Sequence, residues 1–242
     1  MDEQGAARLK QLVTDLTSDQ GYVSGERKFP RRVSLDDAVT IAGGMQAEVD
    51  SGVAARDAAI AAQGLTLACK RGCTGCCEEP IMVHRPEAAR VLRWLKQPEN
   101  AGAREAFRAA YPAWKERVGD TPARLSALSN DAEAYLAEHV EGWRKGVLCA
   151  FNRGGDCTIY PVRPIVCRGG HALDTSEHCT GIAEKPAARA TFVPLDDFIA
   201  RTRGLLAATH NAVGGPKGRV EALCDVVYSL LPARSARYTG TP

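Results

Sequence analysis

Four cysteines fall within nine residues, in the run Cys69-Lys-Arg-Gly-Cys73-Thr-Gly-Cys76-Cys77. Thiolates this close together either cross-link or hold metal, because a bare cluster of them is self-repelling and reactive. A second group recurs at short intervals further along the chain. It consists of Cys149, Cys157, Cys167 and Cys179. The fold must therefore bring together two loops about seventy residues apart if all of these sulfurs serve one site.

The cellular compartment that the sequence indicates favours metal binding over disulfide formation for these cysteines. Residues 1–8 lack the basic segment and apolar run of a secretory signal. No stretch approaches the roughly 18 uninterrupted apolar residues needed to span a bilayer. We therefore expect a cytoplasmic protein, whose thiols are kept reduced. In that compartment clustered cysteines more often bind metal than form structural disulfides, and a total of nine cannot pair completely.

The amino-acid composition limits the classes of partner that we expect for this protein. The formal net charge is only +2, with basic and acidic residues interspersed. This gives no electrostatic reason to expect nucleic acid or an anionic membrane as a partner. The 45% hydrophobic content is ample for a buried core. The expected partner is an unidentified protein or a small-molecule substrate.

Helical spacing of apolar residues predicts a mainly α fold, in which a helical domain carries two irregular cysteine-rich loops that converge on a metal centre. Ser34 is expected to cap one helix that runs to about residue 50, and Gly64 to end another. We expect a kink or break at Pro112, and a short strand or extended link over 80–84. The helices are expected over residues 6–16, 34–50, 53–63, 87–96, 103–118, 123–145, 195–213 and 219–231.

These patterns suggest three parts. Residues 1–64 form an N-terminal helical extension, and residues 65–182 form the cysteine-cluster metal-binding domain with intervening helices. Residues 183–242 form C-terminal helices that pack on the same domain. Within the middle part, residues 147–179 are rich in Gly, Pro and Cys with little periodicity, which indicates an irregular, metal-braced segment.

The first loop has cluster-binding spacing. Three thiolates spaced as in Cys-x-x-x-Cys-x-x-Cys can each take one iron of a cubane cluster and leave the fourth iron for a distant residue or a substrate. Radical S-adenosylmethionine enzymes share this spacing, but the strand and helix alternation of their barrel is absent from this chain. Seven or eight thiolates also exceed the four that one zinc ion needs. A [4Fe–4S] cluster, or other bound iron, is therefore the favoured centre.

Zinc remains the alternative, since four thiolates, or three with an imidazole, build its tetrahedral sites. His171 and His178 flank the later cysteines and could complete such a set. The adjacent Cys76 and Cys77 rarely both bind one zinc, so one of them could serve a second metal or stay free. Sulfur-rich ligation excludes calcium and magnesium, which prefer oxygen.

A longer pattern joins the two loops. After the four cysteines of the first loop and Cys149 comes the run Cys157-Thr-Ile-Tyr160-Pro161-Val-Arg163-Pro164-Ile-Val-Cys167-Arg168. Over roughly residues 65–180 this order resembles the YkgJ-type cysteine-cluster family, whose members are described as zinc- or iron-chelating proteins with a CxxxCxxCC signature. The cysteine motif is also similar to that of flagellin lysine methylase, which is thought to carry an iron–sulfur cluster. The resemblance implies metal binding by the cysteines and favours iron, but it does not fix a reaction.

We accordingly predict eight metal ligands, which are Cys69, Cys73, Cys76, Cys77, Cys149, Cys157, Cys167 and Cys179. Arg163 and Arg168 are the candidate cofactor-binding residues around the ligands, because they could offset thiolate charge or donate hydrogen bonds to sulfur. Alternatively, one of them could bind an anionic group of a substrate. A buried arginine that only stabilises the loop is the simpler interpretation of either. Cys224 lies in an apolar helical stretch and is interpreted as a small buried side chain.

The sequence leaves three kinds of function open. The centre could be structural or handle metal, or it could support redox or S-adenosylmethionine-dependent modification chemistry. It could also be a zinc-binding structural or protein-interaction module without catalysis.

Overall fold

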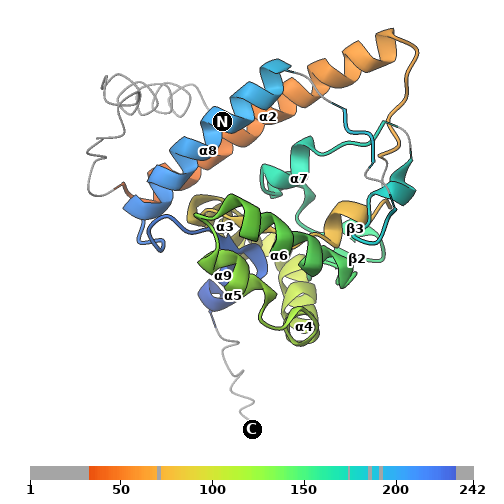
Figure 1. Cartoon of the computed structure of the whole chain (residues 1–242). Coiled ribbons are helices and arrows are strands. Elements are labelled where there is room, and N and C mark those ends of the chain that lie inside the picture. The colour runs from red at the N-terminus through yellow and green to blue at the C-terminus, as the bar shows by residue number, and fades with distance from the viewer. Residues whose placement is uncertain (1–32, 70–71, 174, 185–186, 191–192, 233–242) are drawn as a thin grey trace, which may run out of the picture.

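The computed structural model describes residues 33–69, 72–173, 175–184, 187–190 and 193–232 (Figure 1). The helix expected over residues 6–16 lies outside these ranges. The described part contains eight α-helices and little sheet, so the mainly α prediction is confirmed. No helix of the described part combines the length and apolar character needed to cross a membrane.

Two long helices lie side by side along one edge of the molecule (Figure 1). They are α2 (Leu35–Ala62) and α8 (Val193–Ala212). Ser34 caps α2 as predicted, accepting a hydrogen bond at 3.0 Å from the backbone N–H of Asp37. The two helices expected over 34–50 and 53–63 are in fact one. A single glycine in a helix costs only about 1 kcal/mol, and α2 buries residues along its whole length, from Ala38 to Ile60.

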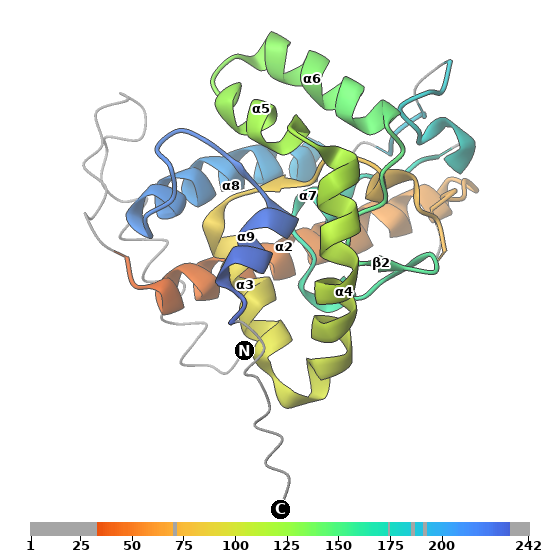
Figure 2. The ribbon, with the colours of Figure 1, turned by 90° about the horizontal axis from the view of Figure 1, so that it is seen from below.

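The middle of the chain forms four helices, shown from below in Figure 2. They are α3 (Arg85–Lys96), α4 (Ala101–Val118), α5 (Thr121–Ala127) and α6 (Ala132–Arg144), with a 3₁₀ turn η3 (Pro98–Asn100) before α4. α4 runs through Pro112 without the expected break, because this proline lies on an exposed face and buried Phe107 and Val118 hold the helix on both sides. The single helix predicted over 123–145 is divided into α5 and α6. Asp131 starts α6 by accepting a hydrogen bond from the backbone N–H of Ala134.

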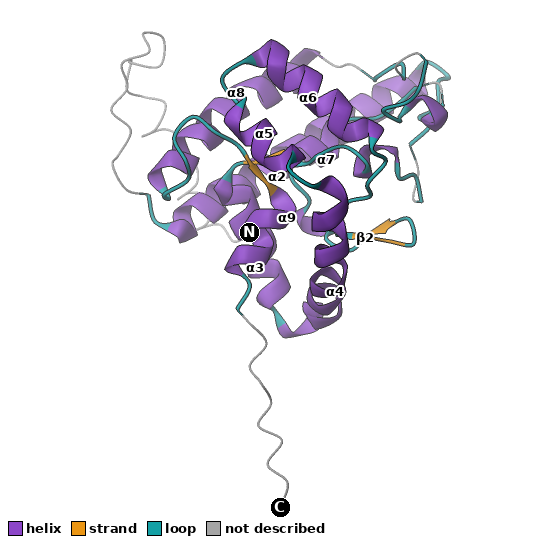
Figure 3. Ribbon diagram, turned by 60° about the horizontal axis from the view of Figure 1, so that its bottom comes forward, coloured by secondary structure: helices purple, strands orange, loops and turns teal. Residues whose placement is uncertain are grey.

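The sheet content is two short antiparallel pairs, visible as the few strands in Figure 3. β1 (Met82–Val83) pairs with β4 (Glu221–Ala222), with Met82 opposite Ala222. This pairing confirms the strand expected near residues 80–84. Because β4 occupies residues 221–222, the last helix, α9 (Leu223–Leu230), begins at Leu223 and not at residue 219 as expected. β2 (Asn152–Arg153) and β3 (Asp156–Cys157) form a hairpin. Four short turns complete the loops, η2 (Gly75–Cys77), η4 (Tyr160–Val162), α7 (Val166–Gly169) and η5 (Ser176–His178).

Three apolar clusters form the core of the described part. The largest lies between α3, α4 and α9 and includes the stacked rings of Phe107 and Phe151, whose centroids are 4.0 Å apart. The second joins α2 and α8 to Ile165 of the second cysteine loop. The third contains Met82, Leu125 and Ala222. The second cysteine loop thus contributes side chains to the first two clusters. α2, expected as part of an N-terminal extension, shares a cluster with the cysteine region.

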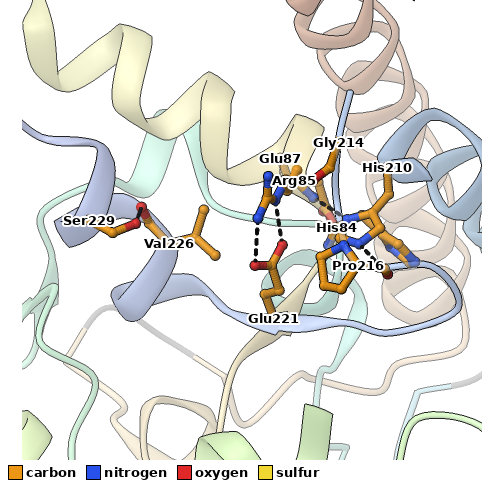
Figure 4. Close-up of polar contacts among 9 residues, drawn as sticks. All are labelled: His84, Arg85, Glu87, His210, Gly214, Pro216, Glu221, Val226 and Ser229. Atoms are coloured by element: carbon orange, nitrogen blue, oxygen red, sulfur yellow. Dashed lines mark hydrogen bonds and ion pairs between the residues drawn. The ribbon is translucent and has the colours of Figure 1, made fainter. Parts of the chain in front are cut away.

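A buried histidine joins the end of α8 to the start of α3 (Figure 4). His210 Nδ1 accepts a hydrogen bond from the backbone N–H of Arg85 at 2.9 Å, so its Nε2 donates to the carbonyl of Pro216 at 3.1 Å. Arg85 also pairs with Glu221 at 2.7 Å. A Cβ at Gly215 would lie 2.3 Å from the ring of His210, so only glycine lets this turn close over the imidazole.

Candidate metal centre

The first cysteine loop turns tightly through glycines. Gly72 has a φ of +90°, a left-handed conformation that other residues rarely adopt. Gly75 begins η2 and lies against the backbone of Cys179. A Cβ at Gly75 would lie 2.5 Å from the carbonyl oxygen of Cys179, so glycine is required for this approach. The turn thereby places Cys76 and Cys77 beside the segment that carries Cys179.

Backbone hydrogen bonds join the first loop to the second. The N–H of Cys149 donates to the carbonyl of Cys77 at 2.7 Å, and the N–H of Ala68 donates to the carbonyl of Ala172 at 2.9 Å. The N–H of Ala172 also donates to the sulfur of Cys69 at 3.1 Å. Figure 1 shows the chain after α2 and the chain after α7 running together on one side of the molecule. The two loops therefore meet, as expected.

Four thiols from both loops lie close enough to act on one another electrostatically. Burial, followed by the charges of Cys149, Cys157 and Cys77, raises the pKa of Cys167 well above its usual value. Burial also raises the pKa of Cys157 to about 11, with Cys149 and Cys77 adding to the effect. Bare thiolates are thus disfavoured at Cys157 and Cys167, and a bound cation would reverse that repulsion.

Cys76 and Cys77 behave as a donor and acceptor pair. The thiol of Cys76 hydrogen-bonds to Cys77, which lowers the pKa of Cys77 to about 6. The same bond, with burial and the charge of Cys77, raises the pKa of Cys76. Cys77 therefore carries the thiolate of the pair near neutral pH, and the two adjacent cysteines are chemically different.

The remaining predicted ligands surround this group. Cys69 receives the Ala172 N–H, and Cys73 is partly buried on the first loop. Cys179 ends η5 against Gly75. Cys224 was interpreted as a core side chain, and it is buried, but its sulfur lies 3.8 Å from that of Cys149. Helical periodicity alone could not indicate that contact, because it depends on how α9 packs against the second loop.

The thiols are gathered without being arranged around one point. Among the residues that the structure describes, no three Cys, His, Asp or Glu side chains form a group able to hold a single metal ion. A tetrahedral zinc site needs four donors at about 2.0–2.3 Å from the ion, so the thiols would have to close up to bind one. The convergence of the loops is observed, while the metal centre of the predicted fold is not itself shown.

Buried donors beside the thiols fit a sulfur-ligated centre. Asn152 and the positive charge of Arg163 both help to lower the pKa of Cys77. Asn152 acts on Cys77 through a side-chain hydrogen bond, while Arg163 Nε is buried without a hydrogen-bond partner in the described part of the chain. The guanidinium of Arg163 lies 4.0 Å above the ring of Tyr160, which fixes its position. Metal-bound thiolates and cluster sulfides accept hydrogen bonds from such donors.

Arg168 has a different position. Its guanidinium is buried and donates to the carbonyls of Arg163 at 2.7 Å and Pro161 at 3.1 Å. It also pairs with Asp50 of α2. Arg168 therefore fastens the second loop to α2, whereas Arg163 lies beside the thiols.

His171 is held by a buried arginine of α2. Arg56 donates to Asp57 and to the carbonyl of Gly169, each at 2.8 Å, and also to Nδ1 of His171. A guanidinium can only donate, so the neutral imidazole must carry its proton on Nε2. Burial and the charge of Arg56 lower the pKa of His171, which favours this neutral form. A metal-binding histidine usually donates its second N–H to an acceptor instead, so His171 suits hydrogen-bond donation better than ligation.

A cavity of about 270 Å³ opens beside the thiols. Cys76, Cys167 and Cys179 line it, and each comes from a different segment. Both candidate histidines, His171 and His178, also line it.

No family model matches the chain, and comparisons with curated proteins and with solved structures find no match either. The chemistry of the site therefore has to be argued from its own residues.

Proposed function

We propose that this chain is a metal-binding cysteine-cluster protein that holds an iron–sulfur cluster, most simply [4Fe–4S], between its two loops. The meeting of Cys77, Cys149, Cys157 and Cys167 at one partly buried place carries the proposal. Cys77 lies far from the other three in the sequence, and the mutual repulsion of the four thiolates is relieved by bound cations. The YkgJ-type order of the cysteines supports the same conclusion.

Three observations favour iron–sulfur over one zinc ion. The thiols near the site outnumber the four that a mononuclear zinc takes. Cys76, Cys167 and Cys179 border a cavity, and the described thiols are spread out and not focused on one point, which suits a polynuclear centre better. The buried donors of Asn152 and Arg163 suit cluster sulfides and thiolates, which remain hydrogen-bond acceptors after metal binding.

When bound, such a cluster supplies one-electron transfer or a Lewis-acidic iron, and so could support redox or S-adenosylmethionine-dependent modification chemistry. The chain's own contribution is electrostatic. Arg163 offsets thiolate charge beside Cys77 and Cys157. Cys167 is partly buried and lines the cavity, so the cavity sets how much water reaches its sulfur. The charge near sulfur and its solvent access both tune a cluster's potential.

The alternative is a zinc-binding structural or protein-interaction module without catalysis. The backbone bonds between the loops favour it, because a metal added at Cys77 and Cys149 would reinforce contacts that already fasten them. In this case the metal would act chiefly by stabilising the fold.

Metal analysis separates the two. Protein purified without oxygen should be brown, absorb broadly in the visible range and contain iron with acid-labile sulfide. Cys157→Ser should lose that absorption, whereas His139→Gln, a histidine of α6 outside the thiol group, should retain it. A colourless protein with stoichiometric zinc would overturn iron in favour of the module, and a protein with neither metal would overturn both.

A further inference from the structure

The cavity beside the thiols has a chemical pattern of its own. Because Cys76, Cys167 and Cys179 line it, any metal that they hold would face this space. Its volume of about 270 Å³ is slightly below the roughly 300–1,000 Å³ of most small-molecule sites. The cavity therefore suits a ligand of few atoms.

Part of the lining is apolar. Ile81, Val140, Trp143 and Val166 contribute to it. Gly181 helps to shape this part, because a Cβ there would lie 2.5 Å from the backbone nitrogen of Arg144. The loop after η5 therefore packs closely against the end of α6. A ligand with a short hydrocarbon body would bury it against these side chains.

The polar part of the lining carries charges of both signs. Arg144, His171 and Arg189 contribute N–H groups, and Glu79 contributes a carboxylate. His171 presents an Nε2–H, since Arg56 occupies its Nδ1. A ligand that bears acceptor oxygens can take up these N–H donors.

Two arginines add positive charge where the cavity meets solvent. The side chains of Arg144 and Arg189 are 53% and 59% exposed. Arg189 pairs with Glu79 at 3.5 Å, and Arg144 pairs with Glu141. The Arg144–Glu141 pair is exposed on both sides and therefore weak, whereas Glu79 is only 15% exposed and lines the cavity, so a ligand carboxylate has to displace Glu79 to reach Arg189.

We propose that this cavity binds a short-chain carboxylate, with its hydrocarbon body against Trp143 and Val140 and its carboxylate near Arg189. The identification of this ligand as a substrate of the adjacent centre rests on the proposed function, but the binding itself does not require it. The fit depends on three features together: small volume, apolar lining and N–H donors.

The test uses pentanoate and its neutral counterpart pentanamide, titrated calorimetrically into the full chain purified without oxygen. Pentanoate should bind, and pentanamide should bind about tenfold more weakly because it lacks the charge that Arg189 recognises. Arg189→Gln should weaken pentanoate binding by a similar factor. Arg124→Gln is the matched control, since Arg124 pairs with Glu138 on the α5 and α6 pair and does not line the cavity.

Tryptophan fluorescence locates the bound molecule. Pentanoate should change the emission of the natural chain, and Trp143→Phe should remove that change while Trp94 and Trp114 remain. Absent binding, or binding that Arg189→Gln and Trp143→Phe leave unaltered, overturns the inference. The metal content of each sample separates the two proposals. Failure to bind in metal-loaded protein refutes only the cavity ligand, and binding by protein that never acquires metal refutes only the cluster.

Discussion

At the scale of single residues, the least expected contact is the one between Cys149 and Cys224. Their sulfurs lie 3.8 Å apart, and a disulfide would require them to close to about 2.05 Å. In the proposed holo protein Cys149 binds metal and is protected. Once the metal is lost, we expect the Cys149 thiolate to attack oxidised glutathione and release one glutathione thiolate. The thiolate of Cys224 then displaces the second glutathione, so that two electrons pass to the oxidant.

Peptide mapping after treatment of metal-free protein with oxidised glutathione should find the Cys149–Cys224 disulfide. Cys224→Ser should stop at the mixed disulfide on Cys149. The metal-loaded protein should remain reduced at both positions. Recovery of free Cys149 and Cys224 from oxidised, metal-free protein would contradict this expectation.

His210 makes the stability of the fold sensitive to acid. Burial lowers its pKa below the ordinary value of 6.5, and both ring nitrogens are engaged with backbone groups that suit only the neutral form. Because the folded pKa lies below the unfolded pKa, the contribution to stability is complete above pH 6.5. It is lost as the pH falls from 6.5 towards the folded value, by up to about 1.4 kcal/mol per pH unit.

Urea denaturation at pH 7.5 and 5.5 checks this behaviour. The free energy of unfolding should fall between these values, and the fall should be about 1 kcal/mol smaller in His210→Asn, which is already destabilised at pH 7.5. His139→Gln should keep the full pH dependence. An equal fall in all three proteins would place the acid sensitivity elsewhere.

At the scale of elements, the close approach between η2 and η5 should tolerate no side chain at Gly75. A Cβ there meets backbone and Cβ atoms of Cys179, which cannot rotate away. We expect Gly75→Ala to lower the free energy of unfolding by about 1–3 kcal/mol and to reduce metal content. The matched control is Gly102→Ala in α4, where a Cβ meets nothing within 4 Å. That substitution should be neutral or stabilising by up to about 1 kcal/mol. Thermal melts of the two variants make the comparison, and equal effects would contradict the packing argument.

The sequence predicted elements well where local signals decide them. Ser34 and Pro86 marked the starts of α2 and α3, and apolar periodicity located α4 and α8. Prediction from the sequence failed at helix and strand boundaries that depend on tertiary contacts. The break expected between residues 50 and 53 is absent from α2, because packing along the helix outweighs the local propensity. The turn before Asp131 was missed, and β4 was hidden because its partner β1 lies far away in the sequence.

In the candidate site, too, the features set by local sequence were predicted and those that depend on tertiary contacts were not. Cysteine spacing predicted two loops that meet, and glycines within them predicted tight turns. The roles of Arg163 and Arg168, the proton position on His171 and the contact of Cys224 depend on partners such as Arg56 and Asp50. Those partners lie more than a hundred residues away in the sequence and have no local signature.

At the scale of the whole molecule, the two loops are anchored unequally. The second loop places Phe151, Ile159, Val162 and Ile165 in the apolar clusters. In the first loop, among described residues 65–79, only Gly75 is buried. The first loop is held mainly by backbone hydrogen bonds and, under our proposal, by metal. The helical core should therefore persist without metal, while the first loop should not.

Hydrogen exchange before and after chelation measures this difference. Peptides covering residues 65–80 should exchange at least about tenfold faster once metal is removed, which corresponds to about 1.4 kcal/mol of lost local stability. Peptides from α3 and α9 should change little, because Val91, Leu95 and Val227 are buried inside an apolar cluster, whereas the predicted ligands Cys149 and Cys157 are only partly buried residues packed against it. Far-ultraviolet circular dichroism should stay helical for the same reason. If protection falls equally in α3 and in the first loop, the metal is a global determinant of folding, and the zinc module becomes the better description.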